Sequence, residues 1–91
     1  MFTLFTMRDV GELDSNEYIT FLYEKYGRSL WKYAYTLSQN NEVASDIVSA
    51  TFLKAIEKIH TIQKIHKYKI KSYLMSMVKN NYLNYINKEK R

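Results

Sequence analysis

The chain of 91 residues contains no cysteine, no proline and only two glycines. Without cysteine it can form neither a disulfide framework nor a thiolate metal site. Turns and β-hairpins usually need glycine or proline, so a shortage of both favours helices joined by short polar connections. Apolar runs are only a few residues long, far below the roughly 20 residues that cross a membrane. These absences predict one small all-α domain.

The beginning of the chain also lacks the features of a targeting signal. Its first eight residues, MFTLFTMR, do not show the order of a basic and then an apolar segment that a signal peptide has. The lack of cysteine fits a reducing compartment. We therefore expect a cytoplasmic protein with no membrane partner.

Charge is divided unevenly along the chain, whose net charge is +5. Residues 1–57 hold five basic and eight acidic residues, which gives −3. Residues 58–91 hold nine basic residues and one acidic residue, which gives +8. A basic half that also carries aromatic residues favours a polyanion as a partner on one side of the domain. A solvated lysine-rich surface would give the same pattern, so charge alone does not distinguish a polyanion-binding surface from an ordinary solvated one.

The first helix has a clear start. Residues 1–13 show no period, and we expect a loose extension before one domain over residues 14–91. Asp14 and Ser15 are candidate N-caps, and Glu17 follows Asp14 at the spacing of a capping box. Apolar residues then recur at steps of three and four, as in a helix with one buried face. This buried face consists of Tyr18, Ile19, Leu22, Tyr26, Leu30, Ala34 and Leu37. Gly27 lies within it, and we expect a neighbouring helix to pass close to this glycine.

Two further helices are expected. The second runs from about residue 42 to residue 59 after a cap at Asn40 or Asn41, and the third runs from about residue 70 to near the C-terminus. The basic segment 60–69 breaks the period and is expected to be a loop. The core residues expected from the second helix are Ala44, Ile47, Val48, Thr51, Ala55 and Ile59, and those from the third are Leu74, Val78, Tyr82, Tyr85 and Ile86. We predict a compact three-helix antiparallel bundle, with room for an extra short helix in the 60–69 segment or in the N-terminal extension.

The second helix has an unusual outer face. Opposite its core residues lie Asp46, Ser49, Ala50, Leu53, Ile56 and Glu57. Leucine and isoleucine between carboxylates have two explanations. They are buried against the chain after residue 60, or they are the apolar anchors of a docking surface whose rim charges select the partner.

The third helix carries a polar stripe. Steps of three and four residues place on one side of this helix Tyr73, Ser76, Asn80, Asn84, Asn87 and Arg91. Asparagine is a mediocre helix former, but its amide offers the donor and the acceptor that base edges require. Tyr73, with Tyr68 before it, can stack on an unpaired base. The lysines that can hold phosphates beside the stripe are Lys67, Lys69, Lys71 and Lys79. The stripe predicts single-stranded nucleic acid as a ligand, and an ordinary solvated helix face is the alternative.

Catalytic motifs are missing from the sequence. His60 and His66 are the only histidines, and no carboxylates cluster near them. The chain has no glycine-rich phosphate loop and no Ser-His-Asp set. We therefore expect no enzyme, no metal and no cofactor.

Two blocks of the sequence have a recognisable pattern. Residues 44–55 read ASDIVSATFLKA, and residues 72–80 and 84–91 read SYLMSMVKN and NYINKEKR. The first block resembles the AEDLVQETFLKA stretch, and the second the SWLYTIARN…DYLRKKKR stretch, of region 2 in bacterial sigma factors of the sigma-70 family, especially the extracytoplasmic-function group. The resemblance covers roughly residues 16–91.

The resemblance implies a subunit of RNA polymerase that recognises promoters. It implies docking on the clamp helices of the polymerase β′ subunit through Asp46, Ile47, Val48, Ser49 and Leu53. It also implies that the 60–69 segment and the last helix capture the melted non-template strand of the −10 element, with one base flipped out of the stack. The residues expected at this single-stranded DNA are Lys67, Tyr68, Lys69, Tyr73, Ser76, Lys79, Asn80, Asn84, Asn87 and Arg91.

The sequence departs from the family pattern at several of these positions. Ser49 stands where the family usually has Gln, Tyr73 replaces Trp, Asn84 replaces Asp and Asn87 replaces Arg. The family's region 4-type domain, which reads the −35 element, is absent up to Arg91, so the chain is either shortened or half of a split sigma factor. An anti-sigma factor is a candidate partner. Two other functions stay open: an interaction module that does not engage DNA, and a general basic binder of duplex DNA.

Overall fold

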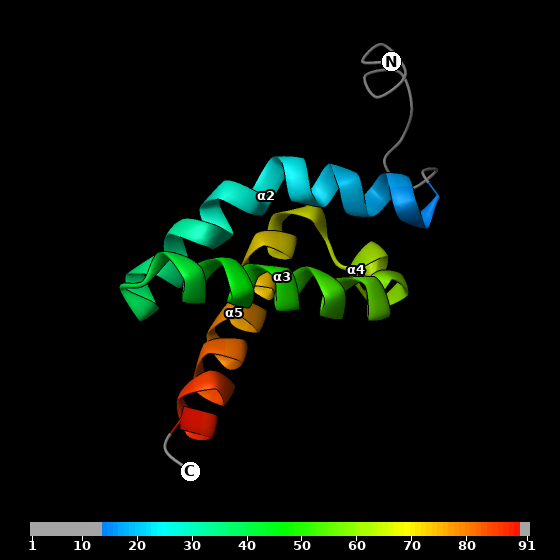
Figure 1. Cartoon of the computed structure of the whole chain (residues 1–91). Helices are drawn as coiled ribbons and strands as arrows, with labels where there is room; N and C mark the ends of the chain where they lie inside the picture. The colour runs from blue at the N-terminus through cyan, green and yellow to red at the C-terminus, as the bar shows by residue number, and fades with distance from the viewer. Residues whose placement is uncertain (1–13, 90–91) are drawn as a thin grey trace.

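A computed structural model of the chain describes residues 14–89, which form α2 (Ser15–Ser38), α3 (Asn41–Glu57), α4 (Ile59–Lys64) and α5 (Lys67–Glu89). Within this range there is no strand, and the predicted all-α bundle is confirmed. α2 and α3 run antiparallel and side by side, while α5 crosses them and its C-terminal half extends beyond the pair (Figure 1). None of the helices in this range is long and apolar enough to cross a membrane. The expected N-terminal extension and Arg91 lie outside the described residues.

The predicted capping box is present at the start of α2. In it, the Glu17 N–H donates to Asp14 Oδ1 at 2.8 Å and the Asp14 N–H donates to Glu17 Oε1 at 3.2 Å.

Local hydrogen bonds explain the sharp reversal between α2 and α3. The residue after α2, Gln39, is its C-cap; its φ of 56° is left-handed, and its N–H donates to the Tyr35 carbonyl at 2.7 Å. Asn40 then caps α3, because its Oδ1 accepts from the Val43 N–H at 3.0 Å. Two residues are therefore enough to turn the chain back on itself.

The core lies where α2, α3 and α5 meet, and α4 closes one end. Side chains with almost no exposed surface come from all four helices: Leu22, Leu30, Thr51, Ile62, Leu74 and Val78. Phe52 and Ile70, which the sequence analysis did not place in the core, are also buried. Burial raises the pKa of the Tyr18 hydroxyl above its usual 10.0, and the nearby Tyr26 adds to this increase. Tyr18 therefore stays neutral over the physiological range.

Part of the predicted arrangement is wrong. The 60–69 segment is not a loop over most of its length, because residues 60–64 belong to α4, the extra short helix that the sequence analysis allowed for, and its buried Ile59 and Ile62 form the apolar face of that helix. α5 begins at Lys67, three residues earlier than expected, so the basic residues 67–69 belong to its first turn. Tyr85 is 38% exposed and not in the core, since the end of α5 extends past the helices that could cover it.

Gly27 also differs from expectation. The three atoms nearest to a Cβ placed there all belong to the ring of Tyr23, one turn earlier in α2, at 3.7 to 3.9 Å. The glycine is buried, but its closest neighbour is a side chain of its own helix. The expected close approach of another helix does not explain this glycine.

Candidate functional site

The outer face of α3 exposes two large apolar side chains. Leu53 is 64% exposed and Ile56 is 51% exposed. The explanation that they are buried against the chain after residue 60 is therefore wrong. Of the predicted docking residues on this helix, Asp46, Ser49 and Leu53 are exposed, as the docking hypothesis requires.

The other two predicted docking residues lie in the core. Ile47 is 4% exposed and Val48 is 7% exposed. Their positions on the helix turn them toward α2 and α5, so they offer a partner almost no surface. Their side chains support the outer face from beneath, and direct contact with a partner is left to the exposed residues.

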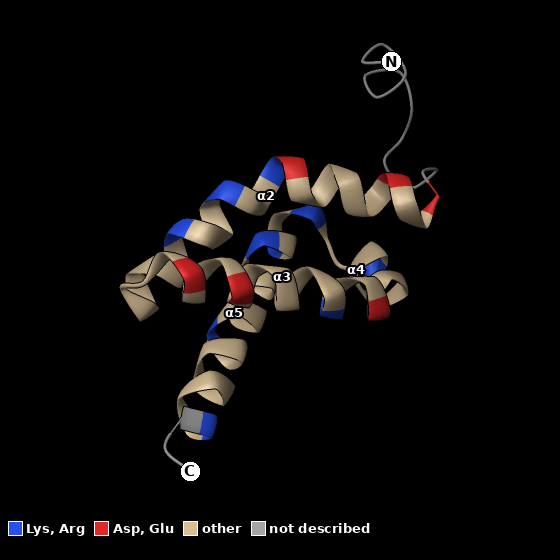
Figure 2. Cartoon of the chain, viewed as in Figure 1, with Lys and Arg blue, Asp and Glu red and all other residues tan. Residues whose placement is uncertain are grey.

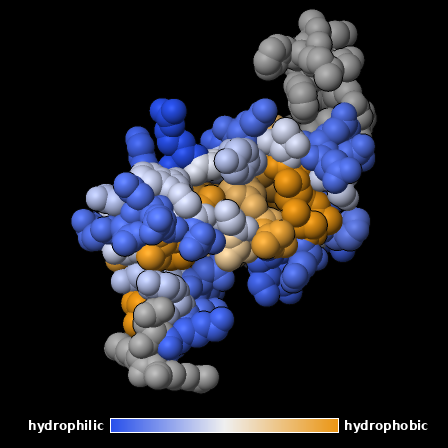
Figure 3. Space-filling view, in the orientation of Figure 1, coloured by the Kyte–Doolittle hydropathy of each residue, from blue (hydrophilic) through white to orange (hydrophobic). Residues whose placement is uncertain are grey.

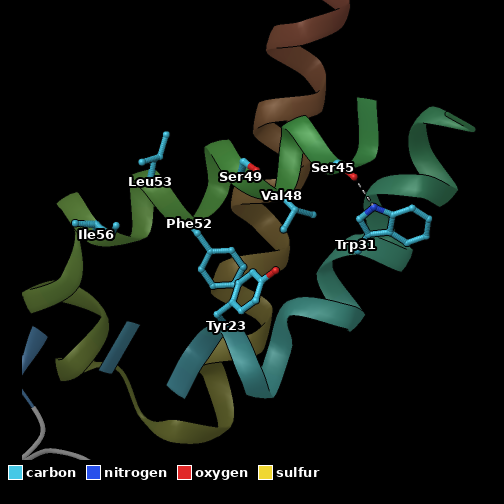
Figure 4. A pocket seen from close by; sticks show the side chains of 8 residues that line it. All are labelled: Tyr23, Trp31, Ser45, Val48, Ser49, Phe52, Leu53 and Ile56. Carbon is cyan, nitrogen blue, oxygen red and sulfur yellow. Dashed lines mark hydrogen bonds between the residues drawn. The ribbon is translucent and has the colours of Figure 1, made fainter. Parts of the chain in front are cut away.

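An apolar groove of about 420 Å³ lies between α2 and α3. Its lining residues are Tyr23, Trp31, Ser45, Val48, Ser49, Phe52, Leu53 and Ile56 (Figure 4). In the space-filling view, apolar side chains gather in the hollow between the two helices, and hydrophilic residues surround them (Figure 3). The groove extends the outer face of α3 onto α2, which the sequence analysis did not foresee.

Aromatic contacts hold the walls of this groove in place. The rings of Tyr23 and Phe52 meet edge to face with centroids 5.2 Å apart. At the other end Trp31 Nε1 donates a hydrogen bond to Ser45 Oγ at 3.1 Å, and its ring stacks on Tyr35. The signal that could have indicated these residues is the spacing of Tyr23 and Trp31, which places both on the edge of the α2 core stripe.

Acidic residues lie at the start of α3. Glu42 and Asp46 line a shallow hollow together with Asn41 and Ser45. Figure 2 shows these carboxylates on α3 and basic residues along α2. A partner helix that crosses the α3 face would therefore meet apolar anchors near Leu53 and negative charge near Asp46.

A second groove, of about 360 Å³, lies between the end of α3 and the polar stripe of α5. Its lining residues are Lys54, Lys58, Tyr73, Ser76, Met77, Asn80, Asn81 and Asn84. The structure thus brings together four of the predicted DNA-binding residues, and it adds two lysines from the other helix. We call this hollow the lysine–asparagine groove.

The lysine–asparagine groove has the groups that a nucleotide needs. Lys54 lies 3.9 Å from Glu57, and both side chains are more than half exposed, so this ion pair is weak and leaves the ammonium available. Tyr73 is half-buried and packs against the core, which fixes its ring. Asn80 and Asn84 are exposed one turn apart. Cations, an aromatic ring and amides on one hollow suit phosphate contact, stacking and hydrogen bonding to base edges.

Tyr68 is separated from Tyr73. Since α5 begins at Lys67, the two tyrosines are five residues apart on one helix, or about 140° around its axis. Tyr68 is 79% exposed, its ring stacks on His66, and Lys67 Nζ lies 5.5 Å from the ring centroid. It presents an aromatic surface, but on another side of α5 from the lysine–asparagine groove.

The remaining predicted DNA-binding residues are spread along α5. Lys69, Lys79 and Asn87 are exposed but line none of the hollows described here. Arg91 lies outside the described residues. The structure therefore concentrates the predicted stripe into a smaller site near the middle of α5.

A third hollow, of about 270 Å³, joins the two candidate surfaces. It lies between α3 and the exposed half of α5 and is lined by Val43, Asp46, Ile47, Ala50, Asn81, Asn84, Tyr85 and Lys88. Asp46 from the predicted docking set and Asn84 from the predicted DNA-binding set thus line the same hollow. The two surfaces adjoin and do not lie on opposite sides of the domain.

Comparison with known proteins gives one match. Residues 22–91 match the family model described as Sigma-70 region 2. No curated protein and no solved structure matches the chain. The matched range includes both grooves and the hollow between them. Within residues 14–89 no three histidine or acidic side chains cluster in a way that could hold a metal ion.

Proposed function

Because the chain belongs to the sigma-70 region 2 family, we propose that it docks on RNA polymerase through the α2–α3 groove and captures promoter DNA through the lysine–asparagine groove. The family is a domain of transcription initiation factors, which bind RNA polymerase and take part in promoter melting, and it is not a catalytic family. The observation that carries the proposal is the pair of adjoining surfaces, one apolar with an acidic end and one basic with amides.

For docking, the clamp helices of the polymerase β′ subunit are the proposed partner. Leu53 and Ile56 would supply apolar anchors, and Asp46 would face a basic group on the partner. Ser49 is shorter than the Gln that is usual in the family, so it leaves the groove beside it open. A partner side chain that enters the groove would contact Phe52 and Tyr23 in place of the missing amide.

Binding to an isolated clamp-helix fragment of β′ tests this docking. We expect Leu53→Asp to abolish binding measured by calorimetry, because it puts a charge among the anchors. Leu83→Asp is the matched control, since Leu83 is an exposed leucine on α5 that lines none of the hollows. It should bind like the unmodified chain, and circular dichroism should show both variants helical. Binding retained by Leu53→Asp would rule out the docking assignment.

For DNA, the proposed ligand is the melted non-template strand of the −10 element. Asn80 and Asn84 would hydrogen-bond to base edges, and Tyr73 would stack on an unpaired base. The cations placed to contact phosphates in the groove and along α5 are Lys54, Lys58, Lys67, Lys69 and Lys79. Tyr68, Ser76, Asn87 and Arg91 would flank this path. Stacking and edge contacts would offset the cost of extruding a base.

Fluorescence anisotropy with single-stranded oligonucleotides tests the DNA site. Asn80→Ala combined with Asn84→Ala should reduce affinity about tenfold or more, because each good base-edge contact contributes about 1–3 kcal/mol. Asn16→Ala with Asn41→Ala removes two exposed amides from the other helices and should leave affinity unchanged. Unchanged affinity in the first pair would favour an interaction module that does not engage DNA. Equal binding to the matching duplex would favour a general binder of duplex DNA.

The finer assignments rest on the sequence blocks at residues 44–55 and 72–80. They favour the extracytoplasmic-function type of sigma factor, and a polymerase partner favours a cytoplasmic location. A region 4-type domain and an anti-sigma factor are the further partners that we propose.

A further inference from the structure

A partly buried hydrogen bond joins the proposed docking helix to the proposed DNA-binding helix. Asn81 Nδ2 on α5 donates to Thr51 Oγ1 on α3 at 2.9 Å. The Thr51 hydroxyl in turn donates to the Ile47 carbonyl at 2.8 Å. In the described part of the chain this is the one hydrogen bond between side chains of α3 and α5 that the structure contains, and Thr51 is fully buried.

Asn81 occupies a position that would otherwise be apolar. Leu74 and Val78, the core residues of α5, precede it by seven and three residues, so the three lie on one side of the helix. Apolar contacts are not directional and allow a helix to rotate or slide by small amounts. A polar pair in a helix interface specifies one register, because other arrangements leave its buried groups unsatisfied.

The rotation of α5 decides where the neighbouring asparagines point. Asn80 precedes Asn81 directly, and Asn84 follows it by three residues. Asn81 and Asn84 both line the lysine–asparagine groove and the hollow next to it. A rotation of roughly 20° about the axis would move a side-chain end at a radius of about 5 Å by about 2 Å. Such a shift is enough to break a hydrogen bond to a base edge.

We infer that Asn81 is a positioning residue, whose hydrogen bond to Thr51 sets the rotation of α5 and so determines the base preference of the lysine–asparagine groove. This inference rests on the proposed DNA-binding function. The amide nitrogen of Asn81 donates to Thr51, which ties this side chain to α3, and the changes at Thr51 below distinguish this effect from a direct contact of the Asn81 amide with a base. The lysines are less affected, because a phosphate contact by a flexible cation tolerates small rotations.

The test compares base preference with overall affinity. An oligonucleotide selected by the unmodified chain from a random single-stranded library is compared with versions changed at one base. We expect Asn81→Leu to reduce the preference for the selected base about tenfold or more. Affinity for the clamp-helix fragment should stay within about twofold of the unmodified chain. Affinity for unrelated oligonucleotides should stay within the same limit in the Thr51→Val variant described next, because Thr51 does not line the groove.

Changes at Thr51 separate positioning from direct contact. Thr51→Val removes the hydroxyl at nearly constant volume and should cause the same loss of preference as Asn81→Leu, whereas Thr51→Ser keeps the hydroxyl and should retain the preference. The double variant of Asn81→Leu with Thr51→Val should lose no more than either single one. If Asn81→Leu does not fold, the Thr51 pair decides alone.

Three results would contradict the inference. Full base preference in Asn81→Leu would overturn it and leave the proposed DNA function intact. Full preference in Thr51→Val would show that any effect of Asn81 is a direct contact. If the unmodified chain itself prefers no base, the proposed recognition of the −10 sequence fails, and the inference fails with it.

Discussion

Gly27 lies in the middle of α2, where glycine lowers helix stability by roughly 0.5–1 kcal/mol relative to alanine. The described chain has no glycine with a positive φ, so the backbone does not require glycine here. An added Cβ would contact the ring of Tyr23 at 3.7 Å, an ordinary van der Waals distance. Gly27→Ala is therefore expected to raise the free energy of unfolding by about 0.5–1 kcal/mol, measured by urea denaturation.

Ala50→Gly provides the matched control for this prediction. Ala50 is exposed within α3, and its replacement should lower the free energy of unfolding by a similar amount. Lower stability in Gly27→Ala would mean that the contact between Tyr23 and Phe52 holds the ring too rigidly to accept a methyl group.

Asn80 and Asn81 show what the spacing of residues along a helix can and cannot predict about a side chain's surroundings. Asn80 and Asn81 are adjacent and identical, yet one is exposed in a groove and the other bonds to the buried Thr51. The polar stripe predicted the exposure of Asn80 from its spacing to Tyr73 and Asn84. Asn81 falls on the side of Leu74 and Val78, but its partner is thirty residues earlier in the chain. Spacing along one helix cannot identify such a partner.

At the scale of elements, the start of α5 combines features that do not favour a helix. No acidic residue lies in its first turn, and three lysines lie at positions 67, 69 and 71. Cations near a helix N-terminus oppose the helix dipole by about 0.3–1 kcal/mol each. His66 compensates in part, because its Nδ1 accepts a hydrogen bond from the Tyr68 N–H at 3.3 Å.

Lys69→Glu should therefore change stability and DNA affinity in opposite directions. An acidic residue in the first turn is expected to raise the free energy of unfolding by about 0.5–1 kcal/mol. The same change would remove a proposed phosphate contact and should weaken binding to single-stranded DNA. Lys32→Glu makes the same charge change within α2, away from its last turn. Lys32→Glu should weaken DNA binding less than Lys69→Glu and should not stabilise the fold. Urea denaturation would measure the stability of each variant, and fluorescence anisotropy would measure its DNA affinity.

Prediction of the elements succeeded where local chemistry decides them. Caps at Asp14 and Asn40 define the starts of α2 and α3, and each was one of the two candidates predicted for its helix. α4 was foreseen only as a possible short helix without bounds, because a single residue, Lys58, separates it from α3, and its two isoleucines lie in a basic segment. Its stability comes from the burial of Ile59 and Ile62 in a core made by the other helices, which the local pattern does not show.

At the scale of the whole molecule, the two proposed interfaces should respond differently to salt. Binding of single-stranded DNA releases counterions, and the logarithm of affinity falls with the logarithm of salt concentration by about 0.7 for each phosphate contact. The five lysine contacts proposed above would give a slope of about −3.5. The proposed docking on the clamp helices would depend more on the apolar Leu53 and Ile56, so its slope should be shallower. A flat salt response for DNA would contradict the basic DNA face.

A pair of substitutions checks which lysines contribute. Lys54→Gln with Lys58→Gln should reduce the steepness of the DNA slope by about 1.4. Arg28→Gln with Lys32→Gln removes the same charge from exposed positions on α2 and should leave the slope nearly unchanged.

The two candidate surfaces, the α2–α3 groove and the lysine–asparagine groove, could be predicted only in part from the sequence. The exposed face of α3 and the stripe of α5 follow from helical spacing, and the structure shows both exposed, except that Tyr73 is half-buried and Arg91 lies outside the described residues. The grooves depend on packing between helices, so the roles of Tyr23, Trp31, Lys54 and Lys58 could not be deduced from periodicity within one segment. Their functions in docking and DNA binding stay predictions.

The end of α5 that projects past α2 and α3 has a consequence for local unfolding. Leu83 is 44% exposed and Tyr85 is 38% exposed, so this end has few tertiary contacts to hold it closed. Helical segments of this kind open at a lower free energy than the core, whose contacts at Leu74 and Val78 open only with the whole domain. Backbone amides should therefore exchange with solvent faster from Leu83 onward than before Val78. A DNA strand bound along Asn84 would slow that exchange, and part of its binding energy would be used to order the helix.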